Sequence, residues 1–107
     1  MSGSSVVRGT GDIFADLGLP DTGERQTKTR LALALNRIIK DRGLKQIDAA
    51  RLLGGPQPKV SALVNYRLEG FSVEKLLAYM VALGLDVDII VRPSRGESAR
   101  VVVLEAA

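Results

Sequence analysis

The chain of 107 residues contains no cysteine and no histidine. These two absences exclude a disulfide framework, thiol catalysis, a Cys/His zinc site and every catalytic triad that needs histidine. The sequence also has no Trp and only two Tyr and two Phe, which leaves few rings to stack on single-stranded nucleic acid. It has neither an apolar signal segment at the N-terminus nor a run long enough to span a bilayer. We therefore expect a soluble, cytoplasmic protein that does not contact a membrane.

What the sequence does have is an uneven distribution of charge. The composition, 46% apolar and 25% charged, is typical of one globular domain. Residues 24–67 contain ten basic and three acidic residues, whereas residues 1–23 and 68–107 each carry a net charge of −2. A basic centre between acidic ends indicates a nucleic-acid footprint. The same charges on a solvated helical surface are an alternative that charge alone leaves open.

Apolar spacing and capping residues predict a mainly α-helical fold with five helices. The expected helices cover residues 12–18, 22–42, 45–53, 58–64 and 73–83. One apolar stripe on the longest helix consists of Leu31, Leu35, Ile38 and Ile39. Asp21 and Glu24 resemble a capping box in front of that helix, and Ser72 is expected to cap the last one.

The last quarter of the chain changes its period. Residues 85–92 alternate apolar and polar side chains at first, and residues 99–104 are rich in β-branched side chains, so both are predicted to be strands. Two strands alone are marginal in water and need the helices or a second chain to cover them. We expect three regions: a flexible N-terminus (1–11), a helical domain (12–84) and a β-rich C-terminal segment used in dimerisation (85–107).

The most informative stretch contains five positions with the spacing of a helix-turn-helix. They are Gln46, Ala50, Gly54, Val60 and Leu63, at offsets 0, 4, 8, 14 and 17. Ala50 is small where the second helix crosses the first, and Gly54 adopts the positive φ of the turn without steric cost. Val60 and Leu63 are expected to face inward. An ordinary helical hairpin is the alternative, but the agreement of five positions favours the helix-turn-helix.

The segments Leu44–Gly54 and Gln57–Ser61 resemble the DNA-binding domain of Xre/Cro-type regulators. Residues 13–20, 70–72 and 83–91 are similar to a subgroup of these regulators that includes HigA-like antitoxins. The resemblance implies a five-helix, lambda-repressor-like domain that forms homodimers and binds palindromic operators in double-stranded DNA. It further implies that the protein represses its own operon and, as in many members, has a HigB-like toxin as its partner.

Six residues are predicted to contact DNA: Gln46, Gln57, Lys59, Ser61, Asn65 and Arg67. By the resemblance, Gln57, Lys59 and Ser61 occupy groove-facing positions of the recognition helix, where Gln pairs with adenine and Lys with guanine or phosphate. Gln46 matches a phosphate-contacting position at a helix N-terminus. Asn65 and Arg67 follow the recognition helix and are expected to touch phosphates. The family has a Ser or Thr cap where this chain has Pro56, so the start of the helix is expected to differ.

Other functions have weaker support in the sequence. Asp86 and Asp88 would share one face of a strand, as a magnesium site requires, but no third ligand accompanies them, so we predict no catalytic residue, no metal and no cofactor. A protein-interaction module that binds a toxin or an enzyme through an exposed strand edge, and leaves DNA alone, is the alternative function. Single-stranded RNA recognition would have to rely on Phe14, Tyr66, Phe71 and Tyr79.

Overall fold

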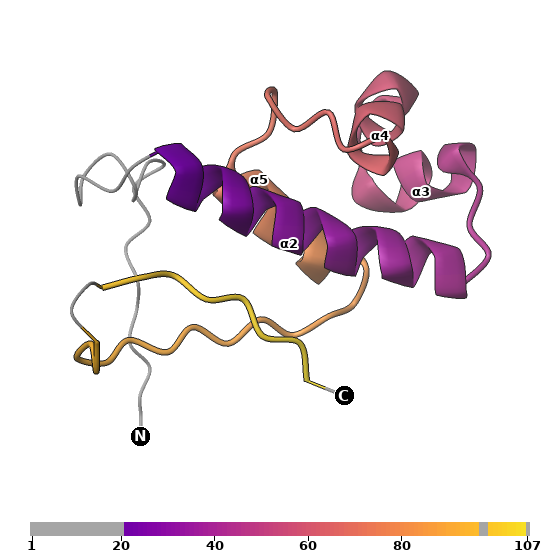
Figure 1. Ribbon diagram of the computed structural model, residues 1–107. Coiled ribbons are helices and arrows are strands. Elements are labelled where there is room, and N and C mark those ends of the chain that lie inside the picture. The colour runs from indigo at the N-terminus through magenta and orange to yellow at the C-terminus, as the bar shows by residue number, and fades with distance from the viewer. Residues whose placement is uncertain (1–20, 97–98, 107) are drawn as a thin grey trace.

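The computed structural model describes residues 21–96 and 99–106 of the chain. These residues form four helices, α2 (Asp21–Asp41), α3 (Gln46–Leu53), α4 (Gln57–Val64) and α5 (Val73–Ala82). In Figure 1 the long α2 crosses in front of α5, and the short α3 and α4 pack together at the end where α2 stops. The fold is mainly α-helical, as predicted. The count of five helices is not supported, because the helix expected at residues 12–18 lies outside the described residues.

The hydrophobic core is built from one face of each helix. The predicted stripe on α2 is confirmed, since Leu31, Leu35 and Ile39 are buried and Ile38 is partly buried. In α3 the buried residues are Ala49, Ala50 and Leu53. Ile47, which lies three residues before Ala50, is instead 54% exposed. An eight-residue helix can turn only one narrow face inward, and here that face follows the spacing i, i+1, i+4.

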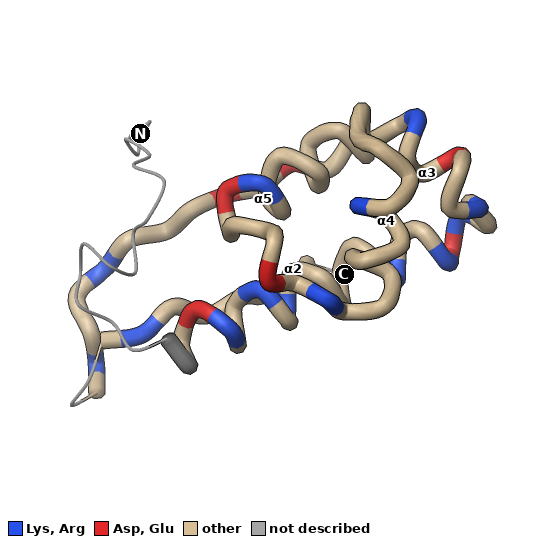
Figure 2. Tube along the Cα trace, turned by 90° about the horizontal axis from the view of Figure 1, so that it is seen from above, with Lys and Arg blue, Asp and Glu red and all other residues tan. Residues whose placement is uncertain are grey.

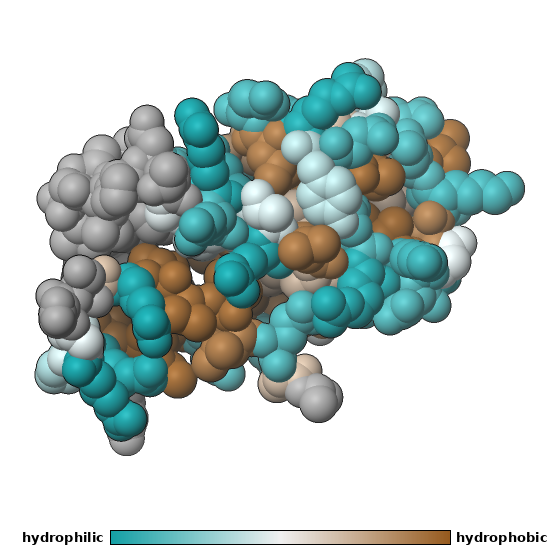
Figure 3. All heavy atoms as spheres, viewed as in Figure 1, coloured by the Kyte–Doolittle hydropathy of each residue, from teal (hydrophilic) through white to brown (hydrophobic). Residues whose placement is uncertain are grey.

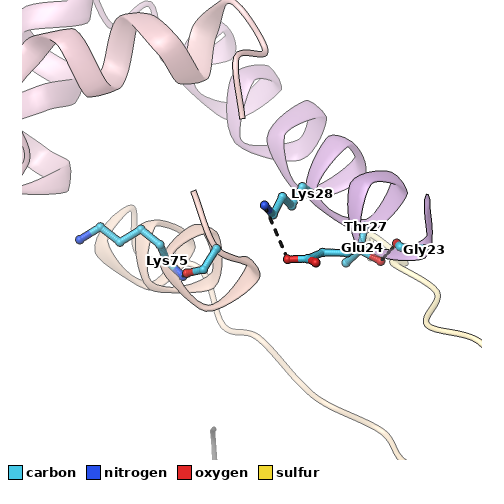
Figure 4. Close-up of polar contacts among 6 residues, drawn as sticks. Gly23, Glu24, Thr27, Lys28 and Lys75 are labelled. Carbon is cyan, nitrogen blue, oxygen red and sulfur yellow. Dashed lines mark hydrogen bonds and ion pairs between the residues drawn. The ribbon is translucent and has the colours of Figure 1, made fainter. Parts of the chain in front are cut away.

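Side-chain contacts organise the first turns of α2 (Figure 4). The buried hydroxyl of Thr27 donates a hydrogen bond to the carbonyl oxygen of Gly23 at 3.0 Å, which satisfies it inside the fold. Lys28 Nζ lies 3.6 Å from Glu24 Oε1, one helical turn away. The helix includes Asp21 itself and so begins earlier than a capping box with Asp21 in front of the helix requires.

The helix α5 begins where the sequence predicts and ends at Ala82, one residue before the predicted Leu83. Ser72 Oγ accepts the backbone N–H of Lys75 at 3.0 Å, which confirms the predicted cap. After the helix, Gly84 adopts a φ of +86°, and the N–H of Leu85 reaches back to the carbonyl oxygen of Met80 at 3.0 Å. This is the pattern of a Schellman ending. None of the described helices is both long and apolar enough to cross a membrane.

The C-terminal segment does not form the predicted strands. Neither the described residues 85–96 nor residues 99–106 are assigned to a strand. In Figure 1 the two stretches, drawn from orange to yellow, run in opposite directions below α2. The turn at the end of the first stretch contains a hydrogen bond from the Gly96 N–H to Ser94 Oγ at 3.2 Å. The prediction of a β-rich C-terminal segment is therefore wrong for the single chain.

The pattern of burial explains this difference. The alternation holds over residues 85–88, where the partly buried Leu85 and Val87 alternate with the exposed Asp86 and Asp88. It then fails, because the residues of the run 89–91 are all apolar and all exposed. A strand stabilised by one buried face requires alternation along its whole length. Figure 3 shows the result as an apolar area over this part of the molecule.

Candidate nucleic-acid interface

The turn between α3 and α4 is made by backbone conformation. Gly54 adopts a φ of +72°, in the left-handed region, as the spacing predicted. The N–H groups of Gly54 and Gly55 both donate to the carbonyl oxygen of Ala50, at 2.9 and 3.2 Å. Pro56 then takes an extended conformation and α4 begins at Gln57. The helix-turn-helix that the spacing predicted is thus formed by two short helices joined by a tight turn.

The recognition helix α4 begins without a side-chain cap. The carbonyl oxygen of Pro56 accepts the N–H groups of Lys59 at 3.0 Å and of Val60 at 3.4 Å. Pro58 lies in the first turn, where its missing N–H leaves no intrahelical bond unmade. The absence of the family's Ser or Thr therefore does not prevent the helix from starting at Gln57, one residue before the predicted position.

One side of α4 is fixed to the body of the protein. Val60 and Leu63 are fully buried, as the helix-turn-helix spacing predicted. The side-chain amide of Asn36, on α2, donates to the carbonyl oxygen of Leu63 at 3.1 Å. The position of α4 is therefore set by packing on one side and by a directional hydrogen bond near its C-terminus.

Three predicted contact residues line the other side of α4. Gln57, Ser61 and Asn65 follow one another at four-residue spacing, which places them along one side of a helix. Gln57 and Asn65 are exposed, and Ser61 is half-buried. The amide nitrogen of Asn65 donates to the carbonyl oxygen of Ser61 at 2.8 Å, which fixes the orientation of this side chain. Polar groups suited to base edges and phosphates thus face away from the core.

Lys59 lies elsewhere. Its Nζ donates to the carbonyl oxygen of Gly70 at 2.7 Å and lies 4.4 Å from the centroid of the Phe71 ring. The helix therefore brings Gln57 and Ser61 together but sends the Lys59 side chain toward the loop between α4 and α5.

The two remaining predicted residues flank this helix pair. Gln46 is the first residue of α3 and is half-buried, and Arg67 is exposed in the loop after α4. Eight of the ten basic residues within 24–67 are exposed: Arg25, Arg30, Arg37, Lys40, Arg42, Lys45, Arg51 and Arg67. Figure 2 shows the basic residues of this part of the chain along α2 and around α3 and α4. The predicted basic centre is thus largely available at the surface.

Tyr66 has an unusual backbone conformation at the end of α4 that the sequence did not predict. It follows α4 with a φ of +58°, the only positive φ of a residue other than glycine in the described chain. The N–H of Tyr66 bonds to the carbonyl oxygen of Leu63 at 3.1 Å, and that of Arg67 to Ala62 at 2.8 Å. This is a Schellman ending with tyrosine where glycine is usual. Its ring is 44% exposed beside Arg67. Only the backbone conformation reveals this position, since the sequence carries no signal for it.

The other aromatic residues of the described chain belong to the core. Phe71 and Tyr79 are both buried and pack edge to face, with ring centroids 6.0 Å apart. Burial raises the pKa of the Tyr79 phenol above its ordinary value of 10.0, because the charged form is poorly solvated there. Neither ring is available to stack on a nucleic-acid base, which weakens the hypothesis of single-stranded RNA recognition.

Comparison with known proteins agrees with this geometry. A protein family described as a helix-turn-helix domain matches residues 13–92 of the chain. A solved structure named as an XRE family transcriptional regulator is 53% identical, and the match covers 81% of this chain and 100% of that chain with a TM-score of 0.78. No curated protein matches the chain.

The match over residues 13–92 defines the class: the chain belongs to the helix-turn-helix domain family and is a DNA-binding protein. The chain is 53% identical to the solved relative over the whole length of that relative, which identifies the particular kind of DNA-binding protein. The protein is an XRE-family transcriptional regulator. The prediction of an Xre/Cro-type regulator is confirmed. The ordinary helical hairpin is excluded as an interpretation.

Proposed function

We propose that the protein is a cytoplasmic, homodimeric repressor of its own operon that binds a palindromic operator. The observation that carries this proposal is the two-sided construction of α4. Val60 and Leu63 hold one side in the core, while Gln57, Ser61 and Asn65 line the other. A helix presented in this way inserts its N-terminal half into the major groove.

The contact residues divide into two groups by chemistry. Gln57 stands at the start of α4, where its amide can pair with the N6 and N7 positions of adenine, and Ser61 follows one turn later. Gln46, Asn65 and Arg67 contact phosphates and set the register on the duplex. The exposed basic residues of 24–67 add an affinity that does not depend on sequence and falls with salt.

The C-terminal segment supports the homodimer. Its exposed apolar residues are Ile89, Ile90, Val91, Val101, Val102 and Leu104. An extended backbone with such side chains gains hydrogen bonds and apolar burial when it pairs with a second extended chain. We accordingly propose a DNA-binding unit at 12–84 and a dimerisation segment at 85–107. A twofold dimer would separate the two recognition helices by about 34 Å, one turn of DNA.

The same apolar residues favour a second candidate role. As a HigA-like antitoxin, the protein would use the segment around Ile90 and Val102 to cover a HigB-like toxin. A pure interaction module, which binds such a partner without reading DNA, is the remaining alternative. It predicts that the exposed side of α4 has no role.

Fluorescence anisotropy tests the proposed function directly. The protein is titrated into the duplex found upstream of its own gene and into a scrambled duplex, across a salt series. We expect tight binding to the upstream duplex, weak binding to the scrambled duplex and a steep decrease in affinity with salt.

Gln57→Ala should weaken binding to the upstream duplex by about 1–3 kcal/mol and leave binding to the scrambled duplex unaffected. The matched control is Gln26→Ala, an exposed glutamine on α2. Equal affinity for both duplexes at every salt concentration contradicts autorepression.

A further inference from the structure

The ammonium group of Lys59 is held by two different contacts, although the residue remains partly exposed. It donates to the carbonyl oxygen of Gly70 at 2.7 Å, and it lies 4.4 Å from the centroid of the Phe71 ring. Phe71 is 2% exposed and is packed against the buried Tyr79, so the ring cannot easily follow a moving side chain. A charge-assisted hydrogen bond and a cation–π contact together favour one orientation of Lys59.

The position of Lys59 on α4 agrees with this orientation. At about 100° per residue, Lys59 is two residues from both Gln57 and Ser61 and so lies roughly 160° from each of them around the helix. It therefore projects from the opposite flank, toward the loop between α4 and α5. To reach a base edge beside Gln57, the side chain would have to give up both the Gly70 and the Phe71 contacts.

Gly70 makes room for the lysine. A Cβ atom built on Gly70 would lie 2.9 Å from Lys59 Nζ, closer than real Cβ contacts. Gly70 is not among the glycines with positive φ, which are Gly43, Gly54 and Gly84 among the described residues. No unusual backbone conformation requires glycine at position 70, and a Cβ atom there would displace the ammonium group, which is the free end of a flexible side chain.

We propose that Lys59 is a positioning residue, which ties the α4–α5 loop to the recognition helix and so holds Arg67 in place for phosphate contact. The loop is attached at both ends. At its start the N–H of Arg67 bonds to the carbonyl oxygen of Ala62 at 2.8 Å, and at its end Lys59 holds Gly70. The side chain of Arg67 is exposed at the first of these two attachments, three residues before Gly70. This inference rests on the proposed operator binding.

A double-mutant cycle on the operator separates positioning from base reading. Lys59→Met, Arg67→Ala and the double variant are titrated into the operator and into operators with single base-pair changes. We expect Lys59→Met to weaken binding about tenfold on all of these duplexes, with their ranking unchanged. In the Arg67→Ala background the same change should have little further effect, because the group it positions is already gone. Gly70→Ala should reproduce the loss and not add to it.

The matched control is Lys75→Met. Lys75 also lies over a ring, with Nζ 5.2 Å from the Tyr79 centroid, but it is on α5. Lys75→Met should leave the affinity for the operator unchanged, and it should not alter the loss of affinity caused by Arg67→Ala. A changed ranking at one base pair with Lys59→Met, or full additivity with Arg67→Ala, would overturn the positioning role while operator recognition stands. If the wild type does not prefer the operator at all, the proposed function fails instead.

A measurement without DNA tests the attachment itself. In the NMR spectrum, the ε-methylene protons of Lys59 should be shifted upfield by the Phe71 ring, and Phe71→Leu should abolish that shift. Ordinary lysine shifts in the wild type would overturn the inference, whatever the DNA titrations show. Thermal unfolding of each variant identifies any that fail to fold.

Discussion

The helix-turn-helix and the C-terminal segment contain similar apolar residues but place them differently. In α3 and α4 the residues Leu53, Val60 and Leu63 are buried in the body of the same chain. In the C-terminal segment Ile90 is 76% exposed and Val91 is 84% exposed. A helix satisfies its backbone hydrogen bonds internally, whereas an extended segment depends on a neighbour. The single chain therefore completes the core of its helix-turn-helix but leaves the apolar residues of the C-terminal segment exposed.

An ion pair joins the C-terminal segment to α2. Arg37 on α2 donates from Nη1 to Glu105 Oε2 at 2.9 Å, and Val103 is partly buried beside the core. Both charged side chains remain substantially exposed, so the pair contributes below about 1 kcal/mol. This contact orients the segment on α2 but cannot replace the missing strand hydrogen bonds.

The largest effect on stability is expected from a change in the buried side of the helix-turn-helix. Leu63→Ala removes a fully buried side chain of α4 and should lower the free energy of unfolding by about 2–5 kcal/mol. Val81→Ala, at a position 62% exposed on α5, is the matched control and should cost below about 0.5 kcal/mol. Urea denaturation measures both. Similar losses for the two variants would mean that the packing of α4 does not stabilise the domain.

A charged residue placed in the exposed C-terminal segment tests whether that segment forms the proposed dimer. Ile90→Lys should convert the proposed homodimer to a monomer, because a second copy cannot bury an unpaired lysine. Affinity for the full palindrome should fall about 100-fold, as the two half-sites are no longer bound together. Sedimentation velocity gives the oligomeric state, and Val81→Lys supplies the same charge on α5. A dimer that persists in Ile90→Lys contradicts the assignment of this surface.

A smaller effect is expected at the end of the recognition helix. Tyr66→Gly removes the cost of a left-handed tyrosine and should raise the free energy of unfolding by about 1 kcal/mol. Tyr66→Phe keeps the Cβ atom and should leave stability unchanged. If Tyr66→Gly also weakens operator binding, the strained residue contributes to recognition. Destabilisation by glycine would show that the ring stabilises this loop.

The smallest effect concerns the dependence of stability on pH. Burial raises the pKa of Tyr79 in the folded state above its ordinary value of 10.0, so the unfolded chain ionises first as pH rises. Stability should therefore be unaffected by Tyr79 below about pH 10 and should decrease above it, through the folded-state pKa. Urea midpoints from pH 8 upward measure this decrease, and Tyr79→Phe should reduce it. A Tyr66→Phe background removes the second tyrosine. If the stability of Tyr79→Phe decreases with pH as much as that of the wild type, the decrease is caused by groups other than Tyr79.

The local features of the helix-turn-helix were predictable from the sequence. Gly54 marks the turn because the left-handed conformation there favours a residue without Cβ, and the three-residue spacing of Val60 and Leu63 defines one helical face. Ser72 caps α5 because its hydroxyl can satisfy a free backbone N–H. Each of these signals acts within a few residues, so no distant contact was needed to interpret it.

Other features depended on parts of the chain that meet only in the fold. The direction of Lys59 is set by Gly70 and the Phe71 ring, eleven and twelve residues later in the sequence. Helical spacing places Lys59 on α4 but does not show which neighbouring residues its long side chain contacts.

The sequence alone determined the family, the two short helices and the residues that form the core side of α4. The tertiary structure decided that Lys59 turns toward Gly70 and Phe71, that Tyr66 ends the recognition helix, and that the described residues 85–96 and 99–106 stay outside any strand. The division has a physical cause. Helices and their caps follow from contacts three or four residues apart, whereas side-chain direction and strand pairing depend on neighbours that only the folded chain, or a second chain, brings close.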